Sequence, residues 1–263
     1  SVAPARSLGG DPDSGAGRVD WSHLQVRAED RRIDLTVATS VRDLVGLLQT
    51  DPLQPADVYL AAGSPWYLTL FGRDSIWASR FALPLGTELA GGTLRALARR
   101  QGRRYDVATA EEPGKIVHEV RRADPGSGAG SHALPPVYYG TVDATPLWLL
   151  LLHEAWLWGL PPDQVRALAP TLEAAVGWLR AGVEAGDDGL LRYSDPTGRG
   201  LSNQGWKDSF DAMRRRDGTI AESPIALLEV QGYAVQAARA AADLRERLLS
   251  ERADDLRGWA DDL

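Results

Sequence analysis

Hydrophobic residues recur along most of this chain at the three- and four-residue spacing of an amphipathic helix. Few stretches alternate strictly between apolar and polar residues, as a half-buried strand does. From Gly63 onward, Gly- and Pro-rich breaks separate the periodic segments. The pattern therefore predicts a mainly helical body, with helices over residues 73–85, 88–101, 145–158, 162–185, 224–240 and 244–262.

The first 56 residues have a different pattern. Residues 1–17 consist largely of Gly, Pro, Ser and Asp, a composition that buries too little apolar surface to order itself. A short amphipathic pattern over residues 36–49, followed by Asp51 and Pro52, predicts one helix. We expect residues 1–56 to form a flexible arm or linker with one short helix, and residues 57–263 to form the main domain.

The overall composition is that of a globular protein. The chain has 263 residues, of which 44% are hydrophobic and 25% are charged, enough apolar material for a core. Its net charge of -7 argues against a nucleic-acid partner, because such binding depends on Lys and Arg side chains that neutralise phosphates.

Few residues could bind a metal ion. The chain has no cysteine, which excludes disulfides, thiolate metal sites and a cysteine nucleophile. No two of its four histidines have paired spacing on one predicted helix; they are His23, His118, His132 and His153. We expect no metal ion and no other cofactor.

No segment predicts a membrane span. The longest apolar run, residues 147–160, is interrupted by His153 and Glu154 and is too short to cross a bilayer. The N-terminus lacks the apolar region of a secretory signal. We expect no membrane partner and a cytoplasmic location.

Two long segments separate the predicted helices. Residues 106–139 and 187–219 both exceed the ~12–15 residues usual for a connection without secondary structure, and such segments are often functional. Together with the residues before the helix predicted at position 73, they carry most of the candidate chemistry.

The first candidate block contains Trp66 and the pair Arg73 and Asp74. A guanidinium and a carboxylate side by side can grip neighbouring sugar hydroxyls, while a Trp face stacks on a pyranose. The simpler alternative is that Asp74 caps the helix and Arg73 pairs with it.

The second and third blocks also allow two interpretations. His118 and Glu119, within residues 113–121, could bind sugar hydroxyls, or Glu119 could titrate in a catalytic role; a solvated cluster of loop charges is the alternative. In the third block, Asp143 or Thr145 could cap the helix predicted over residues 145–158. Capping does not prevent a role in ligand binding.

The fourth block, residues 203–211, contains Trp206, Lys207 and Asp208. A general acid needs burial or a carboxylate neighbour to keep its proton near neutral pH, and an aromatic wall beside Asp208 could supply the burial. Lys207 would oppose this if its ammonium group pointed inward. The alternative is a structural turn rich in Asn, Gly and Asp.

In this order, the four blocks resemble bacterial glycogen-debranching (amylo-α-1,6-glucosidase) proteins and the wider clan of six-hairpin glycosidases. The resemblance covers roughly residues 57–233. It implies an all-α fold, an (α/α) toroid, with only about half of the barrel in this chain, so that residues 57–263 form the N-terminal half of the catalytic domain. It also implies inverting hydrolysis of an oligosaccharide or α-glucan.

The resemblance implies individual roles as well. Asp208 matches the family's general acid, and Arg73 and Asp74 match the pair that holds the non-reducing sugar. Further candidate substrate-binding residues within family-like motifs are Trp66, His118, Glu119, Asp143, Trp206 and Lys207.

The general base is the part of the family pattern that is missing. In the family it is a Glu near the far end of the barrel, and no Glu of this chain lies in such a segment. An inverting enzyme holds its two carboxyl groups roughly 6.5–9.5 Å apart, with water between them. We expect the chain to lack the base and to need the remainder of the barrel as a partner.

Two other functions remain open. A carbohydrate-binding or scaffold module on the same fold would keep Trp66, Arg73 and Asp74 without abnormal titration of Asp208. A sugar epimerase would need paired histidines near the sugar, and the sequence does not place such a pair.

Overall fold

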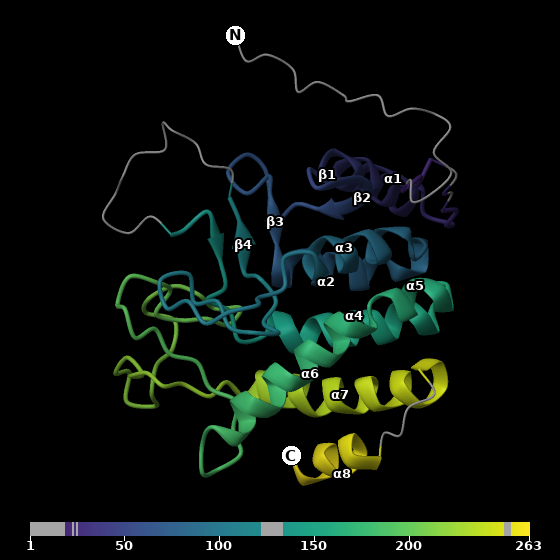
Figure 1. Ribbon diagram of the computed structural model, residues 1–263. Helices are drawn as coiled ribbons and strands as arrows, with labels where there is room; N and C mark the ends of the chain where they lie inside the picture. The colour runs from purple at the N-terminus through teal and green to yellow at the C-terminus, as the bar shows by residue number, and fades with distance from the viewer. Residues whose placement is uncertain (1–18, 23, 25, 122–133, 250–253) are drawn as a thin grey trace.

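The computed structural model describes residues 19–22, 24, 26–121, 134–249 and 254–263. About 48% of these residues are helical, and two small antiparallel sheets accompany the helices (Figure 1). The prediction of a helical body is therefore confirmed in part, but the all-α description is incomplete because it omits the strands. The flexible arm predicted for residues 1–17 lies outside the described residues.

The N-terminal part contains a helix and a hairpin. Helix α1 (Arg31–Gly46) begins after Asp30, whose carboxylate accepts a hydrogen bond from the backbone N–H of Arg32 and so caps the helix. Strands β1 (Leu48–Asp51) and β2 (Gln54–Leu60) then pair in antiparallel register. The helix predicted over residues 36–49 is present but begins and ends earlier. The hairpin was not predicted, and the boundary expected after residue 56 falls inside β2.

Helices α2, α3 and α4 begin within one residue of the predicted positions, whereas later elements differ. The single helix predicted over residues 162–185 is divided into α5 and α6, and the region predicted as one helix over residues 244–262 contains a π-helical turn and then α8, which begins at residue 254. Helix α7 begins at residue 228, after a Pro224–Leu227 stretch that the prediction had included in the helix. The elements are α2 (Gly72–Ala82), the 3-10 turn η1 (Leu83–Leu85), α3 (Glu88–Ala98), α4 (Ala144–Leu157), α5 (Pro162–Ala167), α6 (Ala169–Glu184), α7 (Leu228–Leu244), the π-helical turn η2 (Arg245–Leu249) and α8 (Asp254–Asp262).

These helices form a stack that follows the order of the chain (Figure 1). Helix α2 packs on α3 and α4, α4 packs on α6 and α7, and α7 packs on α8. In the described part of the chain, α4 thus lies between α2 and α7. None of the described helices is long and apolar enough to cross a membrane.

Helix α4 is the centre of the core. All residues from Leu147 to Leu152 are buried, and the indole N–H of Trp148 donates to the carbonyl oxygen of Leu94 at 3.2 Å. A helix that is apolar on all sides must be covered on all sides, and α2, α3, α6 and α7 cover this one. Most of the apolar run at residues 147–160 is therefore a core helix, which ends at Leu157.

A second sheet brings together the strands that precede α2 and α4. Strands β3 (Leu70–Phe71), β4 (Glu119–Val120) and β5 (Val137–Tyr138) pair in the order β3-β4-β5. The segment predicted as a long loop over residues 106–139 therefore contains two strands. In Figure 1 this sheet and the long segment between α6 and α7 lie on the same side of the stack, to the left of the helices.

An ion-pair network fastens the hairpin to α3. The buried Asp51 carboxylate lies 2.6 Å from Nη2 of Arg99 and 2.6 Å from Nη2 of Arg100. Burial alone would raise the pKa of Asp51, but hydrogen bonds from Arg100, Leu53 and Arg99 outweigh burial and lower it to about 2. The network contributes stability only while Asp51 is ionised.

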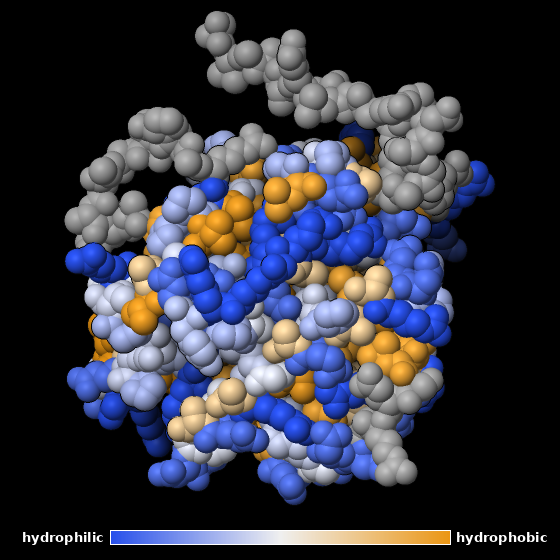
Figure 2. Space-filling view, viewed as in Figure 1, coloured by the Kyte–Doolittle hydropathy of each residue, from blue (hydrophilic) through white to orange (hydrophobic). Residues whose placement is uncertain are grey.

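Some large apolar side chains remain at the surface. Figure 2 shows hydrophobic side chains in several separate places among hydrophilic ones on the face in view. Phe81 on α2 is 76% exposed and Leu228 on α7 is 86% exposed. Apolar groups of this size at the two flanks of α4 leave hydrophobic helix surface uncovered in this chain.

Candidate functional site

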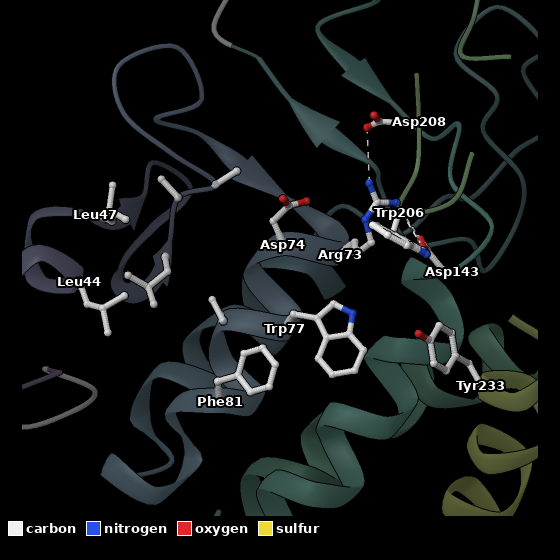
Figure 3. Close-up of a pocket in the computed structure, with 14 residues that line it drawn as sticks. Leu44, Leu47, Arg73, Asp74, Trp77, Phe81, Asp143, Trp206, Asp208 and Tyr233 are labelled. Atoms are coloured by element: carbon white, nitrogen blue, oxygen red, sulfur yellow. Dashed lines mark hydrogen bonds and ion pairs between the residues drawn. The ribbon is translucent and has the colours of Figure 1, made fainter. Parts of the chain in front are cut away.

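An open cavity of about 720 Å³ lies where α2 and α4 begin. Its polar lining comes from three separate parts of the sequence: Arg73 and Asp74 in the first turn of α2, Asp143 just before α4, and Asp208 in the segment between α6 and α7 (Figure 3). This volume is typical of pockets that bind small molecules.

Arg73 joins the carboxylates of two other blocks. Its Nη1 atom lies 3.1 Å from Oδ2 of Asp143, and its Nη2 atom lies 3.6 Å from Oδ2 of Asp208 (Figure 3). Arg73 and Asp143 are both buried, whereas the side chain of Asp208 is 49% exposed. Arg73 therefore pairs across the fold, and the simpler alternative in which it pairs with Asp74 is not what the structure has.

Gly72 allows Arg73 to reach this position. The backbone N–H of Gly72 donates to the carbonyl oxygen of His118 at 2.8 Å. A Cβ atom at Gly72 would collide with the carbonyl oxygen of Val117. The close approach of these two backbones brings the second block against the first turn of α2.

Asp143 is held ready for Arg73 by its neighbours. The residue occupies the N-cap position of α4, but its carboxylate makes no capping hydrogen bond to the described helix. Instead, Oδ1 of Asp143 accepts a hydrogen bond from the hydroxyl of Thr141 at 2.7 Å. Burial raises the pKa of Asp143, while Arg73 and Thr141 act in the opposite direction.

The segment that carries Asp208 is irregular but fixed at several points. The amide of Asn203 donates to the carbonyl oxygen of Ser209 at 2.6 Å and accepts from the hydroxyl of Tyr193 at 3.0 Å. The backbone N–H of Val142 donates to the carbonyl oxygen of Gln204 at 2.9 Å. Asn203 thus closes the turn around Asp208, and the Val142 contact ties that turn to the residue before Asp143.

His118 and Glu119 lie behind the cavity lining. Burial, followed by the charges of Arg73 and Arg121, lowers the pKa of His118 to about 3, so the ring is neutral at physiological pH. The ring packs edge-on against Phe71, with a centroid separation of 5.7 Å. This environment makes His118 a packing residue between the strands.

Glu119 is buried beside the same site. Its Oε1 atom lies 3.0 Å from Nε of Arg121, which is half-exposed. Burial raises the pKa of Glu119; Arg121 opposes this rise, and the nearby carboxylates of Asp208 and Asp74 add to it. The second block is thus within electrostatic reach of the other blocks although it does not line the cavity.

The aromatic residues of the first and fourth blocks differ in position. Trp206 lines the cavity and is 58% exposed. The ammonium group of Lys207 lies 4.9 Å from the centroid of the Trp206 ring, on an exposed side chain. Trp66 is 85% exposed and lies outside the lining. The predicted residues that line the cavity are Arg73, Asp74, Asp143, Trp206 and Asp208, and those that do not are Trp66, Lys207, His118 and Glu119.

Sequence reasoning missed an aromatic wall. Trp77 and Phe81 on α2 and Tyr233 on α7 line the cavity. The spacing of Arg73, Trp77 and Phe81 is the signal that could have found two of them, because residues four apart share one face of a helix.

No protein-family model matches this sequence, and no curated protein matches it. The chemistry of the site must therefore be judged from its residues. Carboxylates outnumber the single guanidinium in the described lining, which disfavours an anionic ligand. Among the described residues, no group of His, Cys, Asp or Glu could hold a metal ion. Donors and acceptors side by side with aromatic faces fit a neutral ligand rich in hydroxyls.

Proposed function

We propose that this chain is part of an inverting α-glycosidase that acts on an oligosaccharide or α-glucan, with Asp208 as the general acid. The observation that supports it most is the meeting of Arg73, Asp143 and Asp208 in one cavity through ion pairs. Three of the blocks that carry the resemblance therefore share one site.

In this proposal a sugar ring occupies the polar end of the cavity. Arg73 and Asp74 grip its hydroxyls as donor and acceptor, and Trp206 contacts its apolar face. Asp208 protonates the glycosidic oxygen as the bond to the anomeric carbon breaks. Water attacks that carbon from the opposite face while a second carboxylate accepts a proton from it, and this direction of attack inverts the anomeric configuration.

The surroundings of Asp208 set a condition on this mechanism. A general acid keeps its proton when it is desolvated, but the side chain of Asp208 is 49% exposed and faces Arg73. A bound sugar, together with further protein over the open side of the cavity, would exclude solvent from the side chain of Asp208. We therefore propose that the remainder of an (α/α) toroid covers the cavity and supplies the general base.

The arrangement of the helices agrees with such a toroid. Helices that follow one another along the chain pack together, α2 on α3 and α7 on α8, as they do in the hairpins of the family fold. Leu228 leaves apolar surface on α7, a helix that flanks α4. A further helix packed there would bury it.

The alternative is a carbohydrate-binding module without hydrolysis. The exposure of Asp208 and its ion pair with Arg73 favour this alternative, because both features suit an ionised carboxylate that only accepts hydrogen bonds. Hydrolysis by the full-length protein separates the two functions.

The test is NMR spectroscopy of the anomer first released from maltose, isomaltose and a branched α-glucan by the full-length protein. Wild type, Asp208→Asn and Asp211→Asn are compared. Asp211 is the matched control, since it lies in the same segment, pairs with Arg214 at 3.1 Å and is outside the lining.

Release of the β-anomer by wild type and Asp211→Asn, with loss in Asp208→Asn, is the expected result. Full activity of Asp208→Asn would show that another group is the acid. Sugar binding without release of any product would favour the binding module.

A further inference from the structure

The cavity has two ends of different chemistry. The carboxylates and Arg73 lie at one end, and an aromatic wall from α2 and α7 lies at the other (Figure 3). Leu44, Leu47 and Ala78 extend the apolar end. A single sugar ring held by Arg73 would leave this end unused.

The indole of Trp77 is fixed from the side away from the cavity. The guanidinium of Arg80 lies 4.3 Å from the centroid of the indole ring. Arg80 in turn donates two hydrogen bonds to Glu154 of α4, from Nε at 2.7 Å and from Nη2 at 2.5 Å. Trp77 belongs to the lining whereas Arg80 does not, so Arg80 holds the indole while part of the indole surface faces the cavity.

Two further aromatic rings contact the indole of Trp77. Phe81 is stacked beside Trp77 with a centroid separation of 5.6 Å and an interplanar angle of 29°. Tyr233 meets the indole edge-on at 6.3 Å and 67°. Figure 3 shows the rings of Trp77 and Phe81 side by side along α2. Trp77 and Phe81 thus place two near-parallel aromatic rings in the cavity lining.

We propose that Trp77 and Phe81 are the platform of a second sugar subsite, beside the one at Arg73. The C–H face of a pyranose stacks on this platform, and Arg80 acts as a positioning residue through Trp77. The substrate class is then a glycoside of at least two linked pyranose rings. This inference rests on the sugar ligand of the proposed function, but it does not require hydrolysis.

The test compares the binding of D-glucose, maltose and isomaltose by isothermal titration calorimetry, using the full chain. We expect Trp77→Ala to bind the preferred disaccharide roughly 3- to 10-fold more weakly and to bind glucose as wild type does, because an aromatic contact is worth about 0.5–1.5 kcal/mol. Trp77→Phe is expected to recover most of the affinity.

Three further variants separate loss of the platform from misfolding and from the loss of any exposed tryptophan. Phe81 is 76% exposed, so Phe81→Ala removes part of the platform without opening the core. Trp158, 56% exposed at the end of α4 and outside the lining, is the matched control, and Trp158→Ala is expected to bind every sugar as wild type does. Arg80→Gln is expected to weaken the disaccharide alone, whereas a purely structural role would weaken glucose equally.

The outcomes separate this inference from the proposed function. Disaccharide affinity that is unchanged in both Trp77→Ala and Phe81→Ala would overturn the platform while leaving a sugar site at Arg73. Absence of binding of all three sugars to the wild-type chain would overturn the platform in this chain, whereas the anomer released by the full-length protein tests the proposed function separately.

Discussion

Replacement of Arg73 by leucine would leave the carboxylate of Asp143 buried without its main partner. The side chain of Asp143 is 2% exposed, and its Oδ2 atom lies 3.1 Å from Nη1 of Arg73. Removal of one member of a buried ion pair costs about 3–5 kcal/mol, because the remaining charge is both desolvated and unpaired. We expect the free energy of unfolding of Arg73→Leu at pH 7 to fall by about this amount.

The pH dependence of this loss has a definite sign. Burial raises the pKa of Asp143, and Arg73 is the largest opposing influence. Without Arg73 this pKa rises further, so the folded variant holds a proton that the unfolded chain releases. A raised pKa in the folded state contributes stability at low pH that is lost as the pH rises through that pKa. The deficit of Arg73→Leu relative to wild type is therefore expected to shrink between pH 7 and pH 5.

Urea unfolding followed by circular dichroism at both pH values measures these effects. Wild type, Arg73→Leu, Asp143→Asn and the double variant form a double-mutant cycle, in which the double variant is expected to lose less than the sum of the single losses. Arg239→Leu is the control, since Arg239 and Asp261 form an exposed pair at 3.0 Å, and such pairs contribute about 0–1 kcal/mol. A deficit that grows toward acid pH, or additive losses, would refute the reasoning.

Three further predictions concern other positions. Asn203→Ala removes the hydrogen bond to the carbonyl oxygen of Ser209. Steady-state kinetics is expected to show a kcat of the proposed hydrolysis that is about 10- to 100-fold lower, because the acid is misplaced. An unchanged kcat would mean that the turn keeps its conformation without Asn203. Asp51→Asn is expected to lower the free energy of unfolding by about 3 kcal/mol at pH 7. Because the pKa of Asp51 is lowered to about 2, this difference should shrink as urea titrations move from about pH 4 toward pH 2. Gly72→Ala is expected to lower Tm by roughly 3 °C or more in thermal unfolding. Gly177→Ala should not lower Tm, because nothing lies within 4 Å of a Cβ atom built there. Equal Tm values for the two variants would contradict the steric collision inferred at Gly72.

The helices were predictable because their signals are local. The run from Leu147 to Leu152 has no polar face, so only a core helix accommodates it, and the structure has one there. The two-residue strands β3, β4 and β5 are too short to show an alternating pattern. The β1–β2 hairpin follows directly on an amphipathic helix, which concealed its first strand.

The sequence predicted which segments carry candidate site residues, but it did not predict how these segments come together. Sequence alone could not decide which polar side chains line the cavity and which are buried behind it, because that depends on contacts between distant segments. His118 and Asp143 look equally suited to a site in the sequence, yet one packs between strands and the other faces Arg73. Trp77 was not among the candidates, because its position in an amphipathic helix resembles that of a core residue.

The two carboxylates that share Arg73 differ in what they can do. Asp143 is buried and hydrogen-bonded to Thr141, so its separation from Arg73 would carry the full cost of an unpaired buried charge. Asp208 is half-exposed and 3.6 Å from the guanidinium, and a pair of this kind contributes about 0–1 kcal/mol. Asp208 can therefore leave Arg73 for a ligand at little cost while Asp143 keeps the guanidinium in place. A permanent pair with the cation would favour the charged form of the carboxyl, so the proposed general acid depends on this ability of Asp208 to leave Arg73 when a ligand binds.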